Sequence, residues 1–381
     1  MAGSVGAERD AGGAPGRKTH ANYKVMVVDD SALIRGLITR TLESDPAIKV
    51  VVSVGNGELA VKAIARADVD VVILDIEMPV MDGLTALPEL LRVKPGVKII
   101  MASTLTRRNA SYSLRALAAG ACDYIAKPAS ARELHSPDGF RHELLAKVKA
   151  LADGADRRPK RGRAATPKVS SLGLYRGTKV VLRKLPMLSP VLIAIGTSTG
   201  GPQALFTIFE ELRSRIRVPI LITQHMPPTF TTILAEHIGR ISGASCTEGR
   251  DKEALAPGHI YLAPGDYHMI VEDQGGPPRI RLTQSAPENY CRPAVDPMLR
   301  SVADVYGPQA LGVILTGMGR DGLEGGRALV EKGGTIIAQD EATSVVWGMP
   351  GAVAAGGLCS SVSPLGEIAR RIFKLVGGSG K

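Results

Sequence analysis

The sequence predicts two successive α/β domains, each built on a doubly wound, mostly parallel sheet. Three observations support this fold class. The chain has 381 residues, more than a single domain usually contains. Apolar runs rich in Val, Ile and Leu alternate with segments of helical periodicity, as in parallel sheets that are covered on both faces. Aromatic residues make up only 4% of the chain, so aliphatic side chains must fill both cores.

The first domain is expected at residues 23–152, after a disordered tail at 1–22 that lacks the apolar stretch of a signal peptide. Five apolar runs each precede a helical pattern, which predicts a five-stranded parallel sheet. The expected strands are YKVMVVDD (23–30), KVVVSVGN (49–56), VDVVILDIEMP (69–79), KIIMAST (98–104) and CDYIAKP (122–128). The expected helices are SALIRGLITRTLES (31–44), GELAVKAIARA (57–67), LTALPELLRV (84–93), ASYSLRALAAG (110–120) and RHELLAKVKALA (141–152).

A basic segment at residues 153–190 is expected to connect the two domains. It holds ten Lys or Arg against two Asp or Glu, and therefore most of the net charge of +10. Because this charge lies among Pro, Gly and Ser with few apolar residues, we expect a flexible, solvated linker and no nucleic-acid-binding face. The alternative is a weak attraction of the segment to acidic partners or anionic lipid head groups.

The second domain is expected at residues 191–377. Its expected strands are VLIAIG (191–196), VPILITQH (218–225), GHIYLAP (258–264), RIRLTQ (279–284), LGVILTG (311–317) and GTIIAQD (334–340). The region 258–284 has no helical pattern and contains Gly-Gly-Pro, which predicts an antiparallel hairpin.

Composition also limits the cellular setting. No apolar run reaches the roughly 18 residues of a membrane span, so the protein is not expected to be embedded in a membrane. The four cysteines are scattered, without metal-like or disulfide-like spacing. We therefore expect a cytoplasmic protein, and a monomer as the simplest state.

Polar side chains follow successive strands of the first domain, at the edge where open α/β sheets bind ligands. Asp29 and Asp30 follow the first strand, Asp75 the third, Ser103 the fourth and Lys127 the fifth. Clustered carboxylates repel one another, so this set predicts a Mg²⁺ site. With a hydroxyl and an ammonium group beside it, the site has the groups needed for phosphoryl transfer to an aspartate. The alternative role of Asp29 or Asp30 is to cap the next helix.

The turn Gly196–Gly200 matches G-x-S-x-G, in which a tight strand-to-helix turn exposes a serine, here Ser198. It also opens a helix, where free N–H groups can bind a phosphate or an oxyanion. The absence of a Walker lysine and of G-x-G-x-x-G weighs against a nucleotide.

His225 and Asp321 also follow buried strands, so a nucleophile, a base and an orienting acid can converge on one sheet edge. The alternatives are a structural histidine and a helix-capping aspartate.

Residues 23–150 resemble the receiver domain of two-component response regulators, on the motifs VVDDS, ILDIEMPVMDG and YIAKP. The resemblance implies that Asp75 accepts a phosphoryl group from a histidine kinase. It implies Mg²⁺ held by Asp30, Asp75 and the backbone carbonyl of Glu77, with Asp29 nearby.

Residues 191–377 resemble the catalytic domain of the chemotaxis-specific protein-glutamate methylesterases. The blocks IGTSTGGP, QHMPPTFT, LAPGDYHM, RPAVDPML and ILTGMGRDG carry this resemblance. It implies Ser198 as nucleophile, His225 as general base and acid, and Asp321 as the partner of His225, without a cofactor. It also implies that Thr199 and the backbone N–H of Met318 help to bind the oxyanion and to position the histidine. Such enzymes hydrolyse γ-glutamyl methyl esters of methyl-accepting chemoreceptors, release methanol, and deamidate certain glutamines.

The two resemblances together predict that phosphorylation gates the hydrolase. They imply that Lys127 pairs with the phosphoryl group and that Ser103 moves to bind it, with Tyr124 as the accompanying switch aromatic. We expect the unphosphorylated first domain to cover the cleft around Ser198 and to block a bulky substrate.

Two rival functions are weighed against this one. A response regulator with a nucleic-acid-binding output needs a basic face in its second half, which here is near neutral. A phosphotransfer module would use the glycine-rich turn for a nucleotide.

Overall fold

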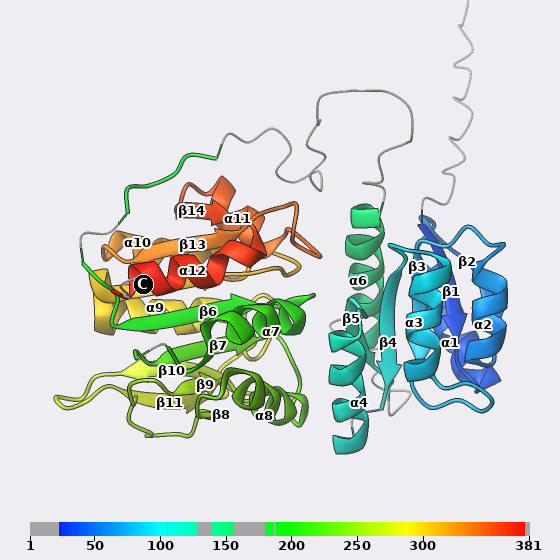
Figure 1. The fold of residues 1–381 in the computed structure, drawn as a ribbon, viewed down its shortest axis with the longest axis horizontal. Coiled ribbons are helices and arrows are strands. Elements are labelled where there is room, and N and C mark those ends of the chain that lie inside the picture. The colour runs from blue at the N-terminus through cyan, green and yellow to red at the C-terminus, as the bar shows by residue number, and fades with distance from the viewer. Residues whose placement is uncertain are drawn as a thin grey trace, which may run out of the picture.

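The computed structural model of the chain describes residues 23–104, 106–128, 139–155, 180–185, 188–215 and 217–377 (Figure 1). The described residues form two α/β domains, as the alternation of apolar runs and helical patterns predicts. The tail expected at 1–22 and most of the linker expected at 153–190 lie outside the described residues.

The first domain contains a five-stranded parallel sheet in the order β2-β1-β3-β4-β5. Its strands are β1 (Tyr23–Val28), β2 (Ile48–Val54), β3 (Val71–Asp75), β4 (Lys98–Ser103) and β5 (Asp123–Ala126). Its helices are α1 (Ala32–Glu43), α2 (Gly57–Ile64), α3 (Gly83–Val93), α4 (Arg107–Ala118) and α6 (Phe140–Ala155).

Both faces of this sheet are buried, which explains the continuous apolar runs. Successive side chains of a strand point to opposite faces. Val25 and Val27 lie in the core that α1 and α6 cover, whereas Met26 and Val28 lie in the core of α2, α3 and α4. The predicted five-stranded doubly wound sheet is therefore confirmed.

The second domain contains a seven-stranded parallel sheet in the order β14-β13-β12-β6-β7-β9-β8 and an antiparallel pair, β10-β11. Its strands are β6 (Leu192–Thr197), β7 (Ile220–Gln224), β8 (Cys246–Glu248), β9 (Ile260–Leu262), β10 (His268–Glu272), β11 (Arg279–Thr283), β12 (Ala310–Ile314), β13 (Thr335–Gln339) and β14 (Cys359–Ser363). Its helices are α7 (Gly201–Leu212), η1 (Arg213–Arg215), α8 (Phe230–Ser242), α9 (Val295–Tyr306), η2 (Gly307–Gln309), α10 (Leu323–Glu331), α11 (Met349–Ala355) and α12 (Leu365–Leu375).

The hairpin predicted in the second domain is confirmed, because β10 and β11 pair across the segment that contains Gly-Gly-Pro. Three strands, β8, β10 and β14, are not among the six expected ones, although β10 is the first strand of the predicted hairpin. The other two, β8 and β14, are polar, and each lies at an outer edge of the seven-stranded sheet. Their strand conformation comes from pairing with β9 and β13, which an apolar pattern cannot reveal.

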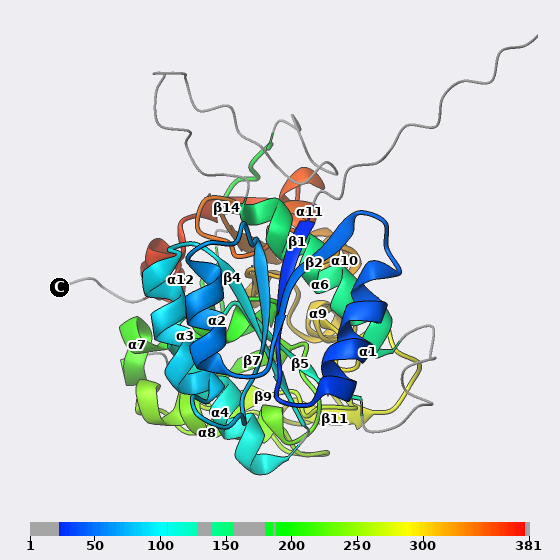
Figure 2. The same ribbon diagram turned by 90° about the vertical axis from the view of Figure 1, so that its right-hand side faces the viewer.

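The two domains pack directly on each other. Helices α4 and α6 of the first domain face the second domain (Figure 1), and α4 contacts both α7 and α8. Figure 2 views the molecule from the side of the first domain, with the second domain behind it. The rings of Tyr124 and Phe230 stack across this interface with centroids 4.5 Å apart. The apolar cores of the domains are thus continuous at the interface.

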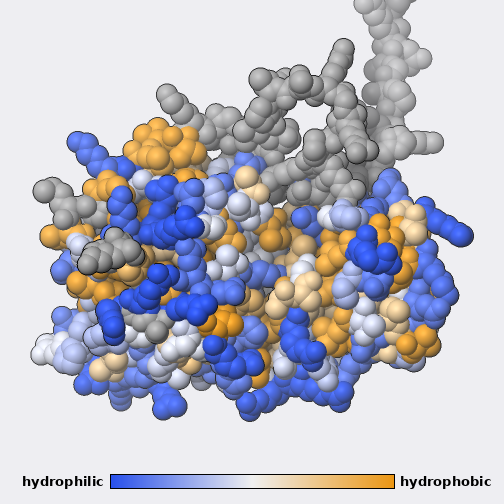
Figure 3. Space-filling model, in the orientation of Figure 1, coloured by the Kyte–Doolittle hydropathy of each residue, from blue (hydrophilic) through white to orange (hydrophobic). Residues whose placement is uncertain are grey.

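On the face shown in Figure 3, hydrophilic and hydrophobic residues alternate in small areas over both domains. Within the described residues, every helix is too short or too polar to cross a bilayer.

Candidate functional site

The glycine-rich turn joins β6 to α7 and carries the half-buried Ser198. Gly200 has a φ of 77°, and a side chain there would meet Val345 at 2.6 Å. A residue without Cβ is therefore required at this point of the turn. The backbone N–H of Ser198 donates to the carbonyl of Thr316 at 3.1 Å, and Gln224 Nε2 donates to the Ser198 carbonyl at 3.0 Å. The neighbouring strands thus fix the position of the serine.

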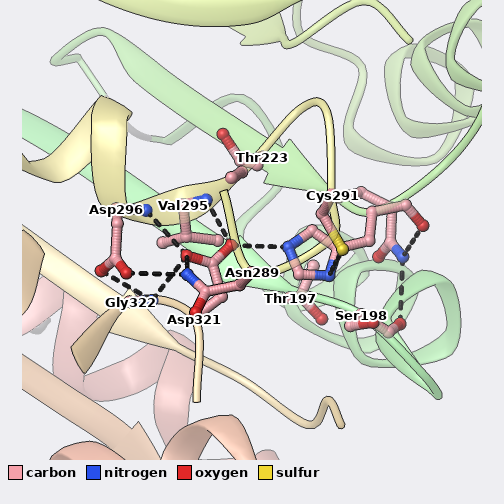
Figure 4. Close-up of polar contacts among 12 residues, drawn as sticks. Thr197, Ser198, Thr223, Asn289, Cys291, Val295, Asp296, Asp321 and Gly322 are labelled. Atoms are coloured by element: carbon pink, nitrogen blue, oxygen red, sulfur yellow. Dashed lines mark hydrogen bonds and ion pairs between the residues drawn. The ribbon is translucent and has the colours of Figure 1, made fainter. Parts of the chain in front are cut away.

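His225 and Asp321 form a close pair beside this turn. His225 directly follows β7, and its Nε2 lies 2.7 Å from Asp321 Oδ2 (Figure 4). Strands β12, β6 and β7 are neighbours in the sheet, so the segments that follow them meet at one edge. The structure therefore brings together the three residues that the sequence analysis placed after buried strands.

Asp321 is held in place by many donors. Its carboxylate accepts hydrogen bonds from the backbone N–H groups of Val295 and Asp296 at 2.6 and 3.0 Å, which open α9. Burial by itself would raise its pKa, but the bonds to His225 and to the backbone N–H groups outweigh this, and the pKa of Asp321 is lowered. Asp321 is therefore an anion that orients the imidazole. It does not cap the helix that follows it in the chain, as the alternative interpretation held.

The second nitrogen of His225 faces a thiol. Nδ1 lies 3.3 Å from Cys291 Sγ, on the other side of the ring from Asp321 (Figure 4). Burial disfavours a charged imidazole, but the charge of Cys291 and the bond to Asp321 outweigh it and raise the pKa of His225 to about 10. Among the described residues, no hydrogen bond joins the Ser198 hydroxyl to His225. In this arrangement Nδ1 of His225 therefore contacts the thiol of Cys291 and not the serine hydroxyl.

Two residues near Asp321 escaped the sequence analysis. Asn289 Nδ2 donates to Asp321 Oδ1 and to Asp296 Oδ2, each at 2.9 Å. Asp296 Oδ1 accepts from the backbone N–H groups of Gly322 and Gly325 at 3.0 and 2.7 Å. Burial and the neighbouring charge of Asp321 raise the pKa of Asp296 to about 6. The block RPAVDPML contains Asp296 at the start of a helix, which was the one available signal.

The first domain supplies one wall of the site. A cavity of about 560 Å³ is lined from the second domain by Ser198, Thr199, His225, Cys291 and Met318, and from the first domain by Tyr124, His142 and Lys147. The His142 ring also lies 5.5 Å from the Tyr290 ring. Side chains of the first domain therefore lie in the same cavity as Ser198 and His225.

A buried hydrogen bond ties the serine turn to the first domain. Thr199 Oγ1 donates to Asp123 Oδ2 at 2.6 Å, and both side chains are almost fully buried. Lys147 Nζ lies 3.3 Å from the same carboxylate oxygen and donates to the Tyr124 carbonyl at 2.6 Å. Thr199, expected near an oxyanion, therefore points its hydroxyl toward the first domain in this arrangement.

The acidic site of the first domain lies at the carboxyl ends of β1 and β3. Ligand oxygens of Asp29, Asp30 and Asp75 lie within 4.8 Å of one another, and Lys127 Nζ is 2.6 Å from both Asp29 and Asp75. Burial above all, with the neighbouring charge of Asp29, raises the pKa of Asp75 to about 6 against the effect of Lys127. A set made only of carboxylate oxygens fits a hard cation such as Mg²⁺.

The contacts of the other residues expected at or beside the acidic site are as follows. Ser31, not Asp29 or Asp30, caps α1. Ser103 Oγ lies 3.1 Å from Ser113 Oγ of α4. The Glu77 side chain is exposed beside Arg108, which leaves its backbone carbonyl as the expected ligand.

Comparisons with known proteins agree with this organisation. Residues 25–137 match the family model of the response regulator receiver domain, and residues 193–372 match the model of the CheB methylesterase. A "protein-glutamate methylesterase/protein-glutamine glutaminase 1" of Paramagnetospirillum magneticum is 56% identical over 366 residues, covering 93% of this chain and 96% of that protein. The protein of the same name from Rhodospirillum rubrum is 55% identical over 367 residues, covering 92% and 94%. The crystal structure of the Thermotoga maritima CheB methylesterase catalytic domain is 40% identical, covers 50% of this chain and 100% of that one, and has a TM-score of 0.48.

Proposed function

Because this chain belongs to the family of protein-glutamate methylesterases/protein-glutamine glutaminases, with a receiver domain ahead of a CheB methylesterase domain, we propose that Ser198, His225 and Asp321 are its catalytic triad. It is a hydrolase of chemotaxis that acts on glutamate methyl esters and on glutamines. The observation that carries the assignment of residues is the 2.7 Å pair of His225 and Asp321 beside the serine turn.

The proposed reaction is an acyl transfer. Since Asp321 occupies Nε2 of His225, the serine proton passes to Nδ1 as Ser198 Oγ attacks the γ-carbonyl of the substrate. The protonated histidine then gives this proton to the leaving methoxy oxygen, which departs as methanol, or to the leaving amide nitrogen of a glutamine, which departs as ammonia. Water hydrolyses the acyl-serine in the second half of the reaction. One site serves both reactions because both substrates present the same γ-carbonyl.

The oxyanion is proposed to bind at the start of α7. Thr199 and Met318 line the cavity together with Ser198. The proposed donors are the backbone N–H of Met318 and the Thr199 hydroxyl, and a donor aimed at a developing oxyanion is worth about 3 kcal/mol. The Thr199 hydroxyl can donate to the oxyanion only after its hydrogen bond to Asp123 is broken.

Phosphorylation of Asp75 is proposed to break the hydrogen bond between Thr199 and Asp123. Asp30, Asp75 and the Glu77 carbonyl would hold Mg²⁺, which neutralises charge on the phosphoryl group when bound. Lys127 is placed to pair with that group, since its Nζ already lies 2.6 Å from Asp75. Ser103 would leave Ser113 to bind it, and the neighbouring Tyr124 would lose its stacking on Phe230.

The proposed partners follow from these two activities. Methyl-accepting chemoreceptors are the protein substrates and a histidine kinase is the phosphodonor. The domain limits given above, the cytoplasmic location and the monomeric state stay predictions.

The test is methanol release from methylated receptor, with and without a small phosphodonor. Ser198→Ala is expected to abolish release while leaving phosphate uptake at Asp75 intact. Ser360→Ala removes the same oxygen from β14, far along the sheet, and serves as the matched control. Methanol release that persists in Ser198→Ala would refute the assignment of Ser198 as nucleophile. The glycine-rich turn would then be interpreted as a phosphate-binding site.

A further inference from the structure

Cys291 contacts the His225–Asp321 pair in a way that catalysis by Ser198 does not explain. Cys291 Sγ lies 3.3 Å from His225 Nδ1, and His225 Nε2 lies 2.7 Å from Asp321 Oδ2. A nucleophile, a base and an orienting acid within hydrogen-bond reach are the recognised arrangement of an activated nucleophile. In this structure the thiol, not the serine, completes it.

The loop that carries Cys291 holds the sulfur in this position. Asn289 and Tyr290 have φ values of 52° and 63°, a left-handed conformation that residues other than glycine rarely adopt. The backbone groups of Glu288 and Cys291 exchange two hydrogen bonds of 3.1 and 2.9 Å across this turn. Asn289 also donates to Asp321, so the loop contacts the triad at two residues, at Asp321 through Asn289 and at His225 through Cys291.

The thiol also lies in an accessible place. Cys291 is only partly buried and lines the cavity of about 560 Å³. Its neighbour Tyr290 is 74% exposed, so the loop reaches the surface. A small molecule can therefore approach the sulfur while the domains remain together.

The other three cysteines have no such surroundings. Cys122 and Cys359 are buried, and burial raises the pKa of Cys359 to about 12. Cys246 is partly buried, and burial likewise raises its pKa to about 12. Within the described part of the chain, Cys291 is the one cysteine whose sulfur contacts a base.

We propose that Cys291 is a reactive thiol that hydroperoxides oxidise, and that this modification switches off the methylesterase by blocking His225. The sulfur attacks one oxygen of the peroxide, the O–O bond breaks, and a sulfenic acid forms. The sulfur loses two electrons and the peroxide gains them. The thiol proton passes to His225 and then to the departing hydroxide, which leaves as water.

The consequence for the esterase follows from the geometry. His225 Nδ1 is the nitrogen that Ser198 needs, because Asp321 occupies the other one. Because the sulfur lies 3.3 Å from Nδ1, an oxygen added to it would crowd the nitrogen at which the serine proton has to arrive. A sulfenic acid is reversible by thiols, so activity would return on reduction.

The first experiment measures reactivity without any substrate, on the full-length protein. Alkylation by iodoacetamide at pH 7 is followed for each cysteine by peptide mass spectrometry. Cys291 is expected to react at least ~10-fold faster than Cys246, which is the internal control, because its neighbouring base can take the thiol proton. His225→Gln is expected to reduce the rate at Cys291 at least ~5-fold while the rate at Cys246 stays the same. Equal rates at the two cysteines, or a rate at Cys291 unaffected by His225→Gln, would overturn the proposal.

The second experiment concerns the switch, and only this part rests on the proposed function. Wild type and Cys291→Ser are treated with hydrogen peroxide, and methanol release is expressed relative to the untreated rate of each protein. The wild type is expected to lose most of its activity and to recover it with dithiothreitol, whereas Cys291→Ser keeps its own rate. Equal losses in both proteins would overturn the switch. Fast alkylation of Cys291 in a protein whose Ser198→Ala variant still releases methanol would refute the triad instead.

Discussion

The buried contact between Asp123 and Thr199 predicts how strongly the first domain restrains the esterase. Asp123 Oδ1 accepts from the backbone N–H of Tyr124 at 2.8 Å, and Oδ2 accepts from Thr199 Oγ1 at 2.6 Å. Replacing Asp123 by Asn preserves the shape and the first of these bonds. It replaces Oδ2 by an NH2 group that can only donate, so Thr199 Oγ1 has to become the acceptor and the bond that joins the domains loses its charge.

The expected magnitude follows from the loss of that charge. A hydrogen bond to a charged group contributes about 1.5–3 kcal/mol, and a neutral one about 0.5–1.5 kcal/mol. Lys147 loses a partner whether the domains are together or apart, so this cost cancels in the comparison. The closed arrangement is thus destabilised relative to the open one by about 1 kcal/mol, which corresponds to a roughly fivefold larger open population.

The assay is methanol release from methylated receptor, with and without a small phosphodonor. For Asp123→Asn the rate without phosphodonor is expected to rise about fivefold. The rate with saturating phosphodonor is expected to stay near that of the wild type, because those molecules are already open. Asp45→Asn is the matched control. It removes a carboxylate that pairs with Lys149 of α6, and none of its bonds within the described residues reaches the second domain.

The result that would refute this reasoning is specific. If Asp123→Asn, with an unchanged circular dichroism spectrum, shows the same ratio of stimulated to basal rate as the wild type, the contact does not hold the domains together. If Asp45→Asn raises the basal rate equally, the effect comes from a general loosening of the first domain.

Three further predictions concern the catalytic domain. Asp296→Asn is expected to lower kcat about tenfold with KM little changed, since Asp296 positions the segment that carries Asp321; steady-state methanol release measures this. The folded pKa of His225, about 10, lies above its ordinary 6.5, so its stabilising effect is complete below pH 6.5 and is lost as the pH rises toward 10. Urea unfolding should therefore show the stability difference between wild type and His225→Gln shrinking from pH 7 to pH 10. Gly200→Ala places a Cβ 2.6 Å from Val345 at a φ of 77°, and thermal unfolding should reveal a loss of about 1–3 kcal/mol.

The sequence predicts the sheet edge of each site well, because strand ends are a local property. Apolar runs mark where β6 and β7 stop, and a polar residue directly after such a run must lie at the carboxyl edge of a parallel sheet. Ser198 and His225 follow this rule, because each is the first residue after a buried strand. Asp321 lies seven positions beyond Ile314, the last residue of β12, and the backbone donors at the start of α9, together with Asn289, hold it beside the histidine.

The rest of the site depends on contacts that no local pattern encodes. Cys291 and Asn289 lie in a loop without periodicity, and left-handed residues turn that loop toward the histidine. Asp123 is the first residue of β5, where a polar side chain gives no indication of its partner. That partner, Thr199, is 76 positions away in another domain. Residues of this kind are identified by tertiary packing, so sequence periodicity misses them.

Strand β5 offers the shortest connection between the two sites. It spans only four residues, Asp123–Ala126, and Lys127 follows it directly. Its first two residues contact Thr199 and Phe230 of the second domain, while Lys127 contacts Asp75 at the other end. A phosphoryl group on Asp75 adds negative charge and bulk beside Lys127, so the position of the lysine must change. In the proposed gating, this change is transmitted along the four residues of β5 to Tyr124 and Asp123. Strand β5 is thus a single element with contacts at both ends, and Asp123→Asn tests its role directly, because the substitution weakens the contact at one end and leaves the contact at the other end intact.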